Sequence, residues 1–180
     1  MDNLDKFYAF KGHFQVVVKD VVSGKEWIHF EDHNTITYIA KRDAVRMFGG
    51  DNTTLRYIQK MKFTDQGYDY ANSGVYPTTE TSDLGVPLLY TASSLGVAYV
   101  DDYTVTNTSK VTFTAIMLTS QGNGSGSQNY SQAGLYTVDE TLLNPPANDM
   151  ATSGLFAIKN FAPVIKNANL QLTFNWSIIV

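Results

Sequence analysis

A short run with two histidines and two acidic residues, residues 29–33, is the part of this sequence most like a metal site. On a β-strand, His29, Glu31 and His33 would point to one face and could offer nitrogen and oxygen ligands. The zinc-protease pattern needs a helix with two histidines one turn apart, and here its glutamate is displaced. We therefore interpret the run as a polar strand end leading into a helix cap, and we expect no metal or other cofactor.

Three pairs of adjacent acidic residues could in principle supply a general acid and a general base: Glu31-Asp32, Asp101-Asp102 and Asp139-Glu140. Neighbours on a strand point to opposite faces, so none of these pairs forms a carboxylate dyad. The glycine-rich stretch 122–126 lacks the spacing of a serine-nucleophile elbow and the lysine of a phosphate-binding loop. The sequence thus predicts a non-enzymatic protein. The catalytic alternative is a hydrolase site assembled from His13, His29 and Asp102.

Two polar stretches carry the residues best suited to contact a partner. The first, at about residues 64–82, is rich in tyrosine, and the second, at about residues 119–130, is rich in Gly, Ser and Asn. Tyrosine offers contact area at low entropic cost, whether to a protein or to a sugar. The candidate interface residues are Tyr68, Tyr70, Tyr76, Gln121, Asn123, Asn129 and Tyr130. Partner binding and plain surface structure both remain open for the tyrosines.

Composition favours a folded domain and excludes several classes of protein. The chain has 180 residues, no Cys, 43% hydrophobic and 17% charged residues, and a formal net charge of −4. It has no thiolate metal site and no disulfide, and no apolar run reaches the roughly 20 residues that span a bilayer. Residues 1–6 lack the apolar segment of a secretory signal, so we expect synthesis and folding in a cytoplasm. No dense basic face indicates a nucleic-acid partner.

The N-terminal third predicts a β-hairpin followed by a helix. β-Branched and aromatic residues dominate both arms of a hairpin over residues 7–30, around a turn at Ser23-Gly24. Apolar residues then recur every three or four positions, which predicts an amphipathic helix over about residues 35–48. We expect Asn34 or Thr35 to cap this helix and a glycine pair to end it.

Most of the remaining chain predicts β-strands, at residues 55–63, 97–117, 135–138, 155–158 and 170–180. The last strand alternates apolar and polar residues in strict period two, so we expect Phe174 and Trp176 in the core. The stretches 64–82 and 119–130 are predicted to be projecting loops, the second a flexible tip. Together these features predict one mainly β domain over residues 1–180, an antiparallel β-sandwich with one amphipathic α-helix.

The order of these segments resembles small virion structural proteins of tailed bacteriophages. In those proteins an asparagine precedes a helix, and a phenylalanine-proline-lysine strand is followed by a closing tryptophan strand. The segments that carry the resemblance are residues 10–12, 34–37, 48–51, 133–136, 155–166 and 170–180. The long loop at about 64–82 is not part of the shared pattern.

The resemblance implies a non-catalytic subunit of the neck, tail or baseplate, made in the host bacterial cytoplasm and located in the virion. Its partners would be copies of itself in a ring and other virion proteins, with no nucleic acid and no membrane. The alternative is a carbohydrate- or receptor-binding β-sandwich module of a phage fibre. That module would use Tyr68, Tyr70, Tyr76 and Trp27, with their rings coplanar on an exposed surface.

Overall fold

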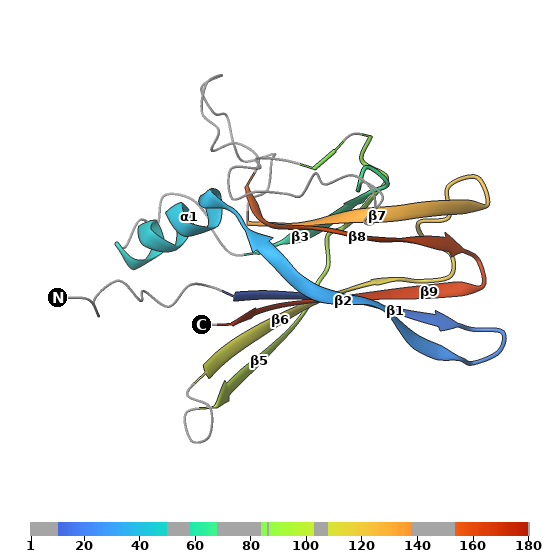
Figure 1. Cartoon of the computed structure of the whole chain (residues 1–180), viewed down its shortest axis with the longest axis horizontal. Coiled ribbons are helices and arrows are strands. Elements are labelled where there is room, and N and C mark those ends of the chain that lie inside the picture. Colours follow the sequence, from blue (N-terminus) through green and yellow to red (C-terminus); the bar gives the residue numbers. More distant parts are fainter. Residues whose placement is uncertain are drawn as a thin grey trace.

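The computed structural model describes residues 11–49, 58–67, 84–85, 87–102, 108–137 and 154–179. These residues contain nine β-strands and one helix, α1, at Tyr38–Phe48 (Figure 1). The strands are β1 Lys11–Asp20, β2 Glu26–Ile36, β3 Lys60–Thr64, β4 Tyr90–Ala92, β5 Gly96–Asp102, β6 Thr108–Met117, β7 Ser127–Tyr136, β8 Leu155–Asn167 and β9 Leu170–Ile179.

All nine strands belong to one antiparallel sheet with the order β4-β3-β7-β8-β2-β1-β9-β6-β5. The sheet bends between β2 and β8, where only Thr35 and Ile36 pair across, with Ile158 and Ala157. We call β2-β1-β9-β6-β5 the first half-sheet and β8-β7-β3-β4 the second half-sheet. In Figure 1, β2 crosses from the level of the first half-sheet up to that of the second.

The two half-sheets face each other across an aromatic core. The ring centroids of Phe14 on β1 and Phe161 on β8 lie 5.4 Å apart, and those of Phe63 on β3 and Phe174 on β9 lie 4.3 Å apart. Each pair joins strands of opposite half-sheets, so the sheet is curled over its own inner face. The predicted antiparallel, mainly β architecture is confirmed.

The C-terminal strand lies in the middle of the first half-sheet, between β1 and β6. Its alternation is confirmed: four inward side chains are buried, namely Leu172, Phe174, Trp176 and Ile178. A strand paired on both sides needs an apolar inner face to cover the core.

The N-terminal hairpin is confirmed, but its second arm is longer than predicted. Gly24 has a φ of 71°, and the Asp20 carboxylate accepts hydrogen bonds from the backbone N–H groups of Val22 and Ser23 in the turn. These backbone bonds, Ser23 first, lower the pKa of Asp20. Because β2 continues to Ile36, the histidine-rich run lies inside the strand, and its interpretation as a strand end was wrong.

The helix begins three residues later than predicted because the strand before it keeps pairing with β8. Thr35 and Ile36 belong to β2, so neither Asn34 nor Thr35 is the cap. The cap is Thr37, whose hydroxyl oxygen accepts the Ala40 N–H at 3.4 Å and also bonds the Leu155 carbonyl. No helix in the described part of the chain is long and apolar enough to cross a membrane.

Several strands differ from the predictions, and the strand predicted at residues 155–158 continues to Asn167 as β8. The strand predicted at 55–63 is described from Lys60 onward as β3, and residues 51–57 lie outside the described residues. The strand predicted at 135–138 is the end of β7, which begins at Ser127. The three-residue strand β4 was not predicted, because so short a strand has no periodicity to detect.

The outer side of the second half-sheet is covered. Leu84, Tyr136, Leu155 and Ile158 form a second buried apolar cluster. Helix α1 packs on β8, and its small residues Ala40 and Ala44 are buried. Among the described residues, no helix or further strand covers the outer face of the first half-sheet or the free edge of β5.

Replacing Trp176 by Ala should lower the free energy of unfolding by about 3–5 kcal/mol, because the indole is fully buried between half-sheets. Trp176→Phe is the matched control. The indole N–H has no hydrogen-bond partner in the described structure, so phenylalanine loses only packing volume. Thermal melts measure both variants. A loss below about 3 °C for Trp176→Ala would show that β9 is not a core strand.

Candidate functional site

The outer face of the first half-sheet carries most of the polar side chains that could do chemistry. Strand register aligns them in rows across β2, β1, β9 and β6. One row is His33, His13, Ser177 and Thr112, and the next is Glu31, Gln15, Asn175 and Thr114. We call these two rows the polar rows.

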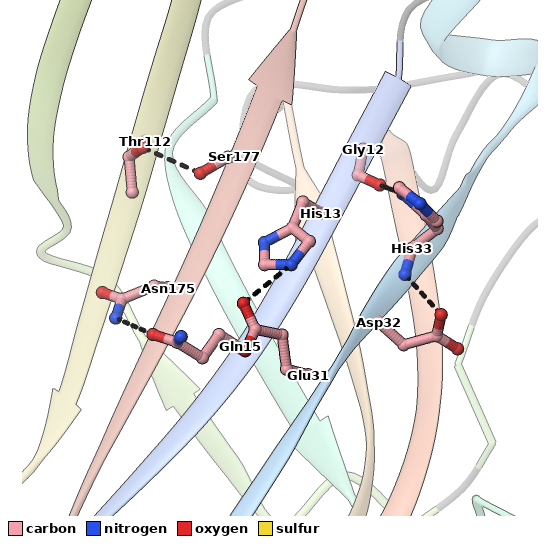
Figure 2. Close-up of polar contacts among 9 residues, drawn as sticks. All are labelled: Gly12, His13, Gln15, Glu31, Asp32, His33, Thr112, Asn175 and Ser177. Atoms are coloured by element: carbon pink, nitrogen blue, oxygen red, sulfur yellow. Dashed lines mark hydrogen bonds and ion pairs between the residues drawn. The ribbon is translucent and has the colours of Figure 1, made fainter. Parts of the chain in front are cut away.

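Histidines and acids in the polar rows bond to one another and to the backbone (Figure 2). His13 Nε2 lies 3.1 Å from Glu31 Oε1. The rings of His13 and His33 meet edge to face with centroids 6.2 Å apart. His33 Nδ1 lies 3.4 Å from the Gly12 carbonyl oxygen, and the backbone N–H of His33 donates to Asp32 Oδ1 at 2.7 Å.

The hydroxyl and amide groups of the polar rows are likewise mutually bonded (Figure 2). The Thr112 and Ser177 hydroxyls are 2.9 Å apart, the Thr114 hydroxyl donates to Asn175 Oδ1, and Asn175 Nδ2 donates to Gln15 Oε1. In the sequence these residues appear only as the polar positions of alternating strands. Their alignment across the sheet depends on strand register, which no local sequence pattern predicts.

Ser177, His13 and Glu31 follow one another across three strands in the order nucleophile, base and acid, but the setting does not suit catalysis. Ser177 is only 6% exposed, and its hydroxyl pairs with Thr112. Both β1 and β9 are paired on each side, so their backbone N–H groups serve the ladders and are not free to stabilise an oxyanion. The arrangement can bind and orient polar groups, but it does not activate a nucleophile.

His29 has a structural role apart from the polar rows. It is the extra residue of a β-bulge, since Val16 pairs with Phe30 and Val17 with Ile28. Its Nε2 lies 3.2 Å from the Ala162 carbonyl oxygen and 3.1 Å from that of Pro163, both on β8. The predicted trio His29, Glu31 and His33 is therefore not brought together.

Lys159, on β8, is a second side chain that links β8 to β2. Its Nζ donates to Asp32 Oδ2 at 2.6 Å and to the His33 carbonyl oxygen at 2.5 Å. It also lies 5.5 Å from the centroid of the Phe30 ring. Side-chain bonds from His29 and Lys159 thus link β2 to β8 where the backbone ladder has only two residue pairs.

The other candidate chemical groups are dispersed. Within the described ranges, no three histidine, aspartate or glutamate side chains are placed to hold a metal ion. The hydrolase alternative fails on distance, because β9 and β6 separate His13 on β1 from Asp102 on β5, and His29 is bonded to β8. The pair Asp139-Glu140 lies outside the described residues.

The Gly/Ser/Asn stretch predicted as a flexible tip is a bonded turn between β6 and β7. Gln121 Oε1 accepts the Leu118 N–H, and Asn123 Nδ2 donates to the Thr119 carbonyl at 2.7 Å. Gly122, Gly124 and Gly126 have φ values of 65°, 53° and 140°, which side-chain-bearing residues rarely adopt. Glycine serves the turn geometry here, so the composition that suggested flexibility instead reflects a specific backbone path.

Tyr130 was wrongly predicted as an interface residue, because it is fully buried on the inner face of β7. Its hydroxyl donates to the Gly122 carbonyl at 2.9 Å. Burial, reinforced by the nearby Tyr90 phenol, raises the pKa of Tyr130 to about 12. Of the candidate residues in this turn, Gln121 and Asn123 bond within the turn, and Asn129 remains exposed.

Lys166 supports the turn from β8. It is fully buried, and its Nζ donates to Asn123 Oδ1 at 2.6 Å and to the Asn167 carbonyl at 2.8 Å. Burial lowers the pKa of Lys166, because the charged form loses hydration. The lysine and Asn123 together fix the turn to the second half-sheet.

The predicted aromatic binding set is tested only at Trp27. This residue is 38% exposed near the hairpin turn, with Lys25 Nζ 5.8 Å from the centroid of its ring. Tyr68, Tyr70 and Tyr76 lie outside the described residues.

Comparison of the chain with protein-family models, with curated proteins and with solved structures gave no match.

Adding a chelator should change neither the melting temperature nor the oligomeric state. His13, His29 and His33 all have hydrogen-bonding or ring contacts that need no metal. Differential scanning calorimetry with and without chelator measures this. A melting temperature that falls with chelator and recovers with zinc would contradict our assignment of structural roles to these histidines.

Tyr130→Phe should cost about 1–2 kcal/mol at neutral pH, because the Gly122 carbonyl loses its donor. In alkali the order should reverse, so that Tyr130→Phe becomes more stable than the parent protein. A folded-state pKa raised from the ordinary value of about 10 to about 12 leaves stability intact below pH 10, and stability falls as pH rises from 10 through 12. Tyr130→Phe should lose less stability over that range than the parent, by pH-dependent urea denaturation.

Tyr99→Phe is the control for alkaline unfolding, because Tyr99 is 76% exposed. It should keep the alkaline loss of the parent. Equal alkaline losses in the parent and in Tyr130→Phe would show that Tyr130 does not cause the loss.

Proposed function

We propose that this protein is a non-enzymatic structural subunit of a tailed-phage virion, assembling symmetrically with copies of itself in the neck, tail or baseplate. The observation that carries the assembly part is the open first half-sheet, whose outer face and edge strand β5 are uncovered in the described chain. The phage context rests on the order of sequence segments given above.

The use of polar groups supports a structural role. His29, Lys159 and Lys166 have the chemistry of catalytic groups, yet each bonds to backbone carbonyls that hold strands or turns in place. The side chains of the polar rows bond to one another across the strands. A protein built to carry contacts needs this rigidity, because pre-organised surfaces lose less entropy on assembly.

The alternative is a carbohydrate- or receptor-binding module of a phage fibre, and one observation favours it. The polar rows present hydroxyl, amide and imidazole groups on a partly exposed surface, and such groups can exchange hydrogen bonds with a sugar. A glycan array with purified protein tests this alternative, with His13→Ala and Asn175→Ala as variants that remove groups from the face.

Replacing residues 68–80 with a short Gly/Ser link should leave the melting temperature unchanged and abolish incorporation into particles. Loop closure costs little, whereas the tyrosine-rich segment would supply contacts to neighbours. The deletion begins after Gly67, because the carbonyl oxygen of Gly67 accepts the Ser131 hydroxyl at 2.7 Å and this contact should be kept. Mass spectrometry of purified virions measures incorporation.

A full-length variant with Tyr68, Tyr70 and Tyr76 all changed to Ser separates loop length from aromatic content. It should incorporate poorly too if the rings make the contacts. Normal incorporation of the shortened protein would contradict the assembly role of this segment and would favour the receptor-binding alternative.

A further inference from the structure

β5 is the longer of the two edge strands in the described structure. It is the last strand of the sheet order, and it spans seven residues, Gly96–Asp102. β6 pairs with one side of β5, and no strand of the described residues pairs with the backbone N–H and C=O groups on its other side. The strand at the opposite end of the sheet, β4, has only three residues.

Apolar side chains along β5 are exposed. Val97 is 47% exposed, Tyr99 76% and Val100 53%. Val97 and Tyr99 are aligned with Phe113 and Val111 of β6, which pack into the core, so they lie on the core side of the sheet. The second half-sheet does not cover them there, and Figure 1 shows β5 and β6 diverging from it.

Natural edge strands are usually protected by charged residues, proline, a bulge or very short length. The first five residues of β5, Gly96 to Val100, have none of these, and the register with β6 is continuous. The only charged residues of β5, Asp101 and Asp102, stand together at one end. An edge without such protection indicates that another strand covers it in the working form of the protein.

The position of the two acids favours one direction of pairing between two copies of β5. We propose that β5 pairs antiparallel with β5 of a second copy of this chain, about a two-fold axis at Tyr99. This register places Asp101 opposite Val97 and Asp102 opposite Gly96, so each acid faces an uncharged residue. Parallel pairing in register would instead set the acids side by side, which is destabilising.

The interface joins two nine-stranded sheets into one continuous sheet. Tyr99 of each copy meets its counterpart at the axis, where cross-strand aromatic pairs stabilise a sheet. Such a contact is isologous and closes on itself as a dimer, so a ring would need a second, different contact. The inference rests on the proposed self-assembly and names the strand through which one of its contacts forms.

Cysteine crosslinking tests the register directly, because the natural chain has no cysteine. Tyr99→Cys should form a disulfide-linked dimer on mild oxidation, since the two thiols meet at the axis. Val97→Cys should not, because each residue 97 is then about four residues, or roughly 13 Å, from its counterpart. Tyr38→Cys, at an exposed tyrosine on α1, is the matched control and should form no disulfide-linked dimer.

Sedimentation equilibrium provides the second measurement. Tyr99→Lys should raise the dimer dissociation constant at least about tenfold, because two like charges would face each other. Tyr38→Lys should leave the constant unchanged, and circular dichroism should show both variants folded.

A parent that stays monomeric at all concentrations, or equal crosslinking at positions 97, 99 and 38, would overturn the inference. Binding of β5 only to a strand of another virion protein would overturn it as well. A β5-linked dimer that is absent from virions would support this inference while contradicting the proposed virion role, so the two failures are distinguishable.

Discussion

The contact between aromatic side chains on opposite half-sheets is the interaction on which the rest of this structure depends. The ring centroids of Phe14 and Phe161 lie 5.4 Å apart, and those of Phe63 and Phe174 lie 4.3 Å apart. Backbone pairing between the half-sheets is limited to two residue pairs. Burial of these rings must therefore supply most of the energy that keeps the sheet curled, because large aromatic side chains bury the most apolar area.

Curling the sheet also determines where polar groups are used. The bend leaves β2 and β8 without a full ladder, and His29 and Lys159 bond the carbonyl oxygens on either side of the gap. An unpaired backbone carbonyl near the core is costly, so these side chains complete the hydrogen bonding that the bend interrupts. The most chemically reactive residue types in the described chain thereby serve the fold.

The same geometry exposes one side of the sheet. Helix α1 and the Leu84 cluster cover the outer side of the second half-sheet, whereas no described element covers the outer face of the first half-sheet or its β5 edge. The proposed function depends on contact surfaces. The polar rows suit exchange of hydrogen bonds, and the apolar edge suits strand pairing, by which one copy of a sheet can extend another.

Local patterns determined several features of this protein by themselves: the hairpin turn at Gly24, the buried alternation of Phe174 and Trp176, and the mainly β class. These follow from backbone conformational preference and from a two-residue period, which are properties of neighbouring residues. Only the tertiary structure decided that Tyr130 is core, that His29 bonds β8, that Thr37 caps α1 and that Ser177 lies beside His13. Each of these depends on which distant strands pair and in what register, and long-range pairing leaves no local period in the sequence.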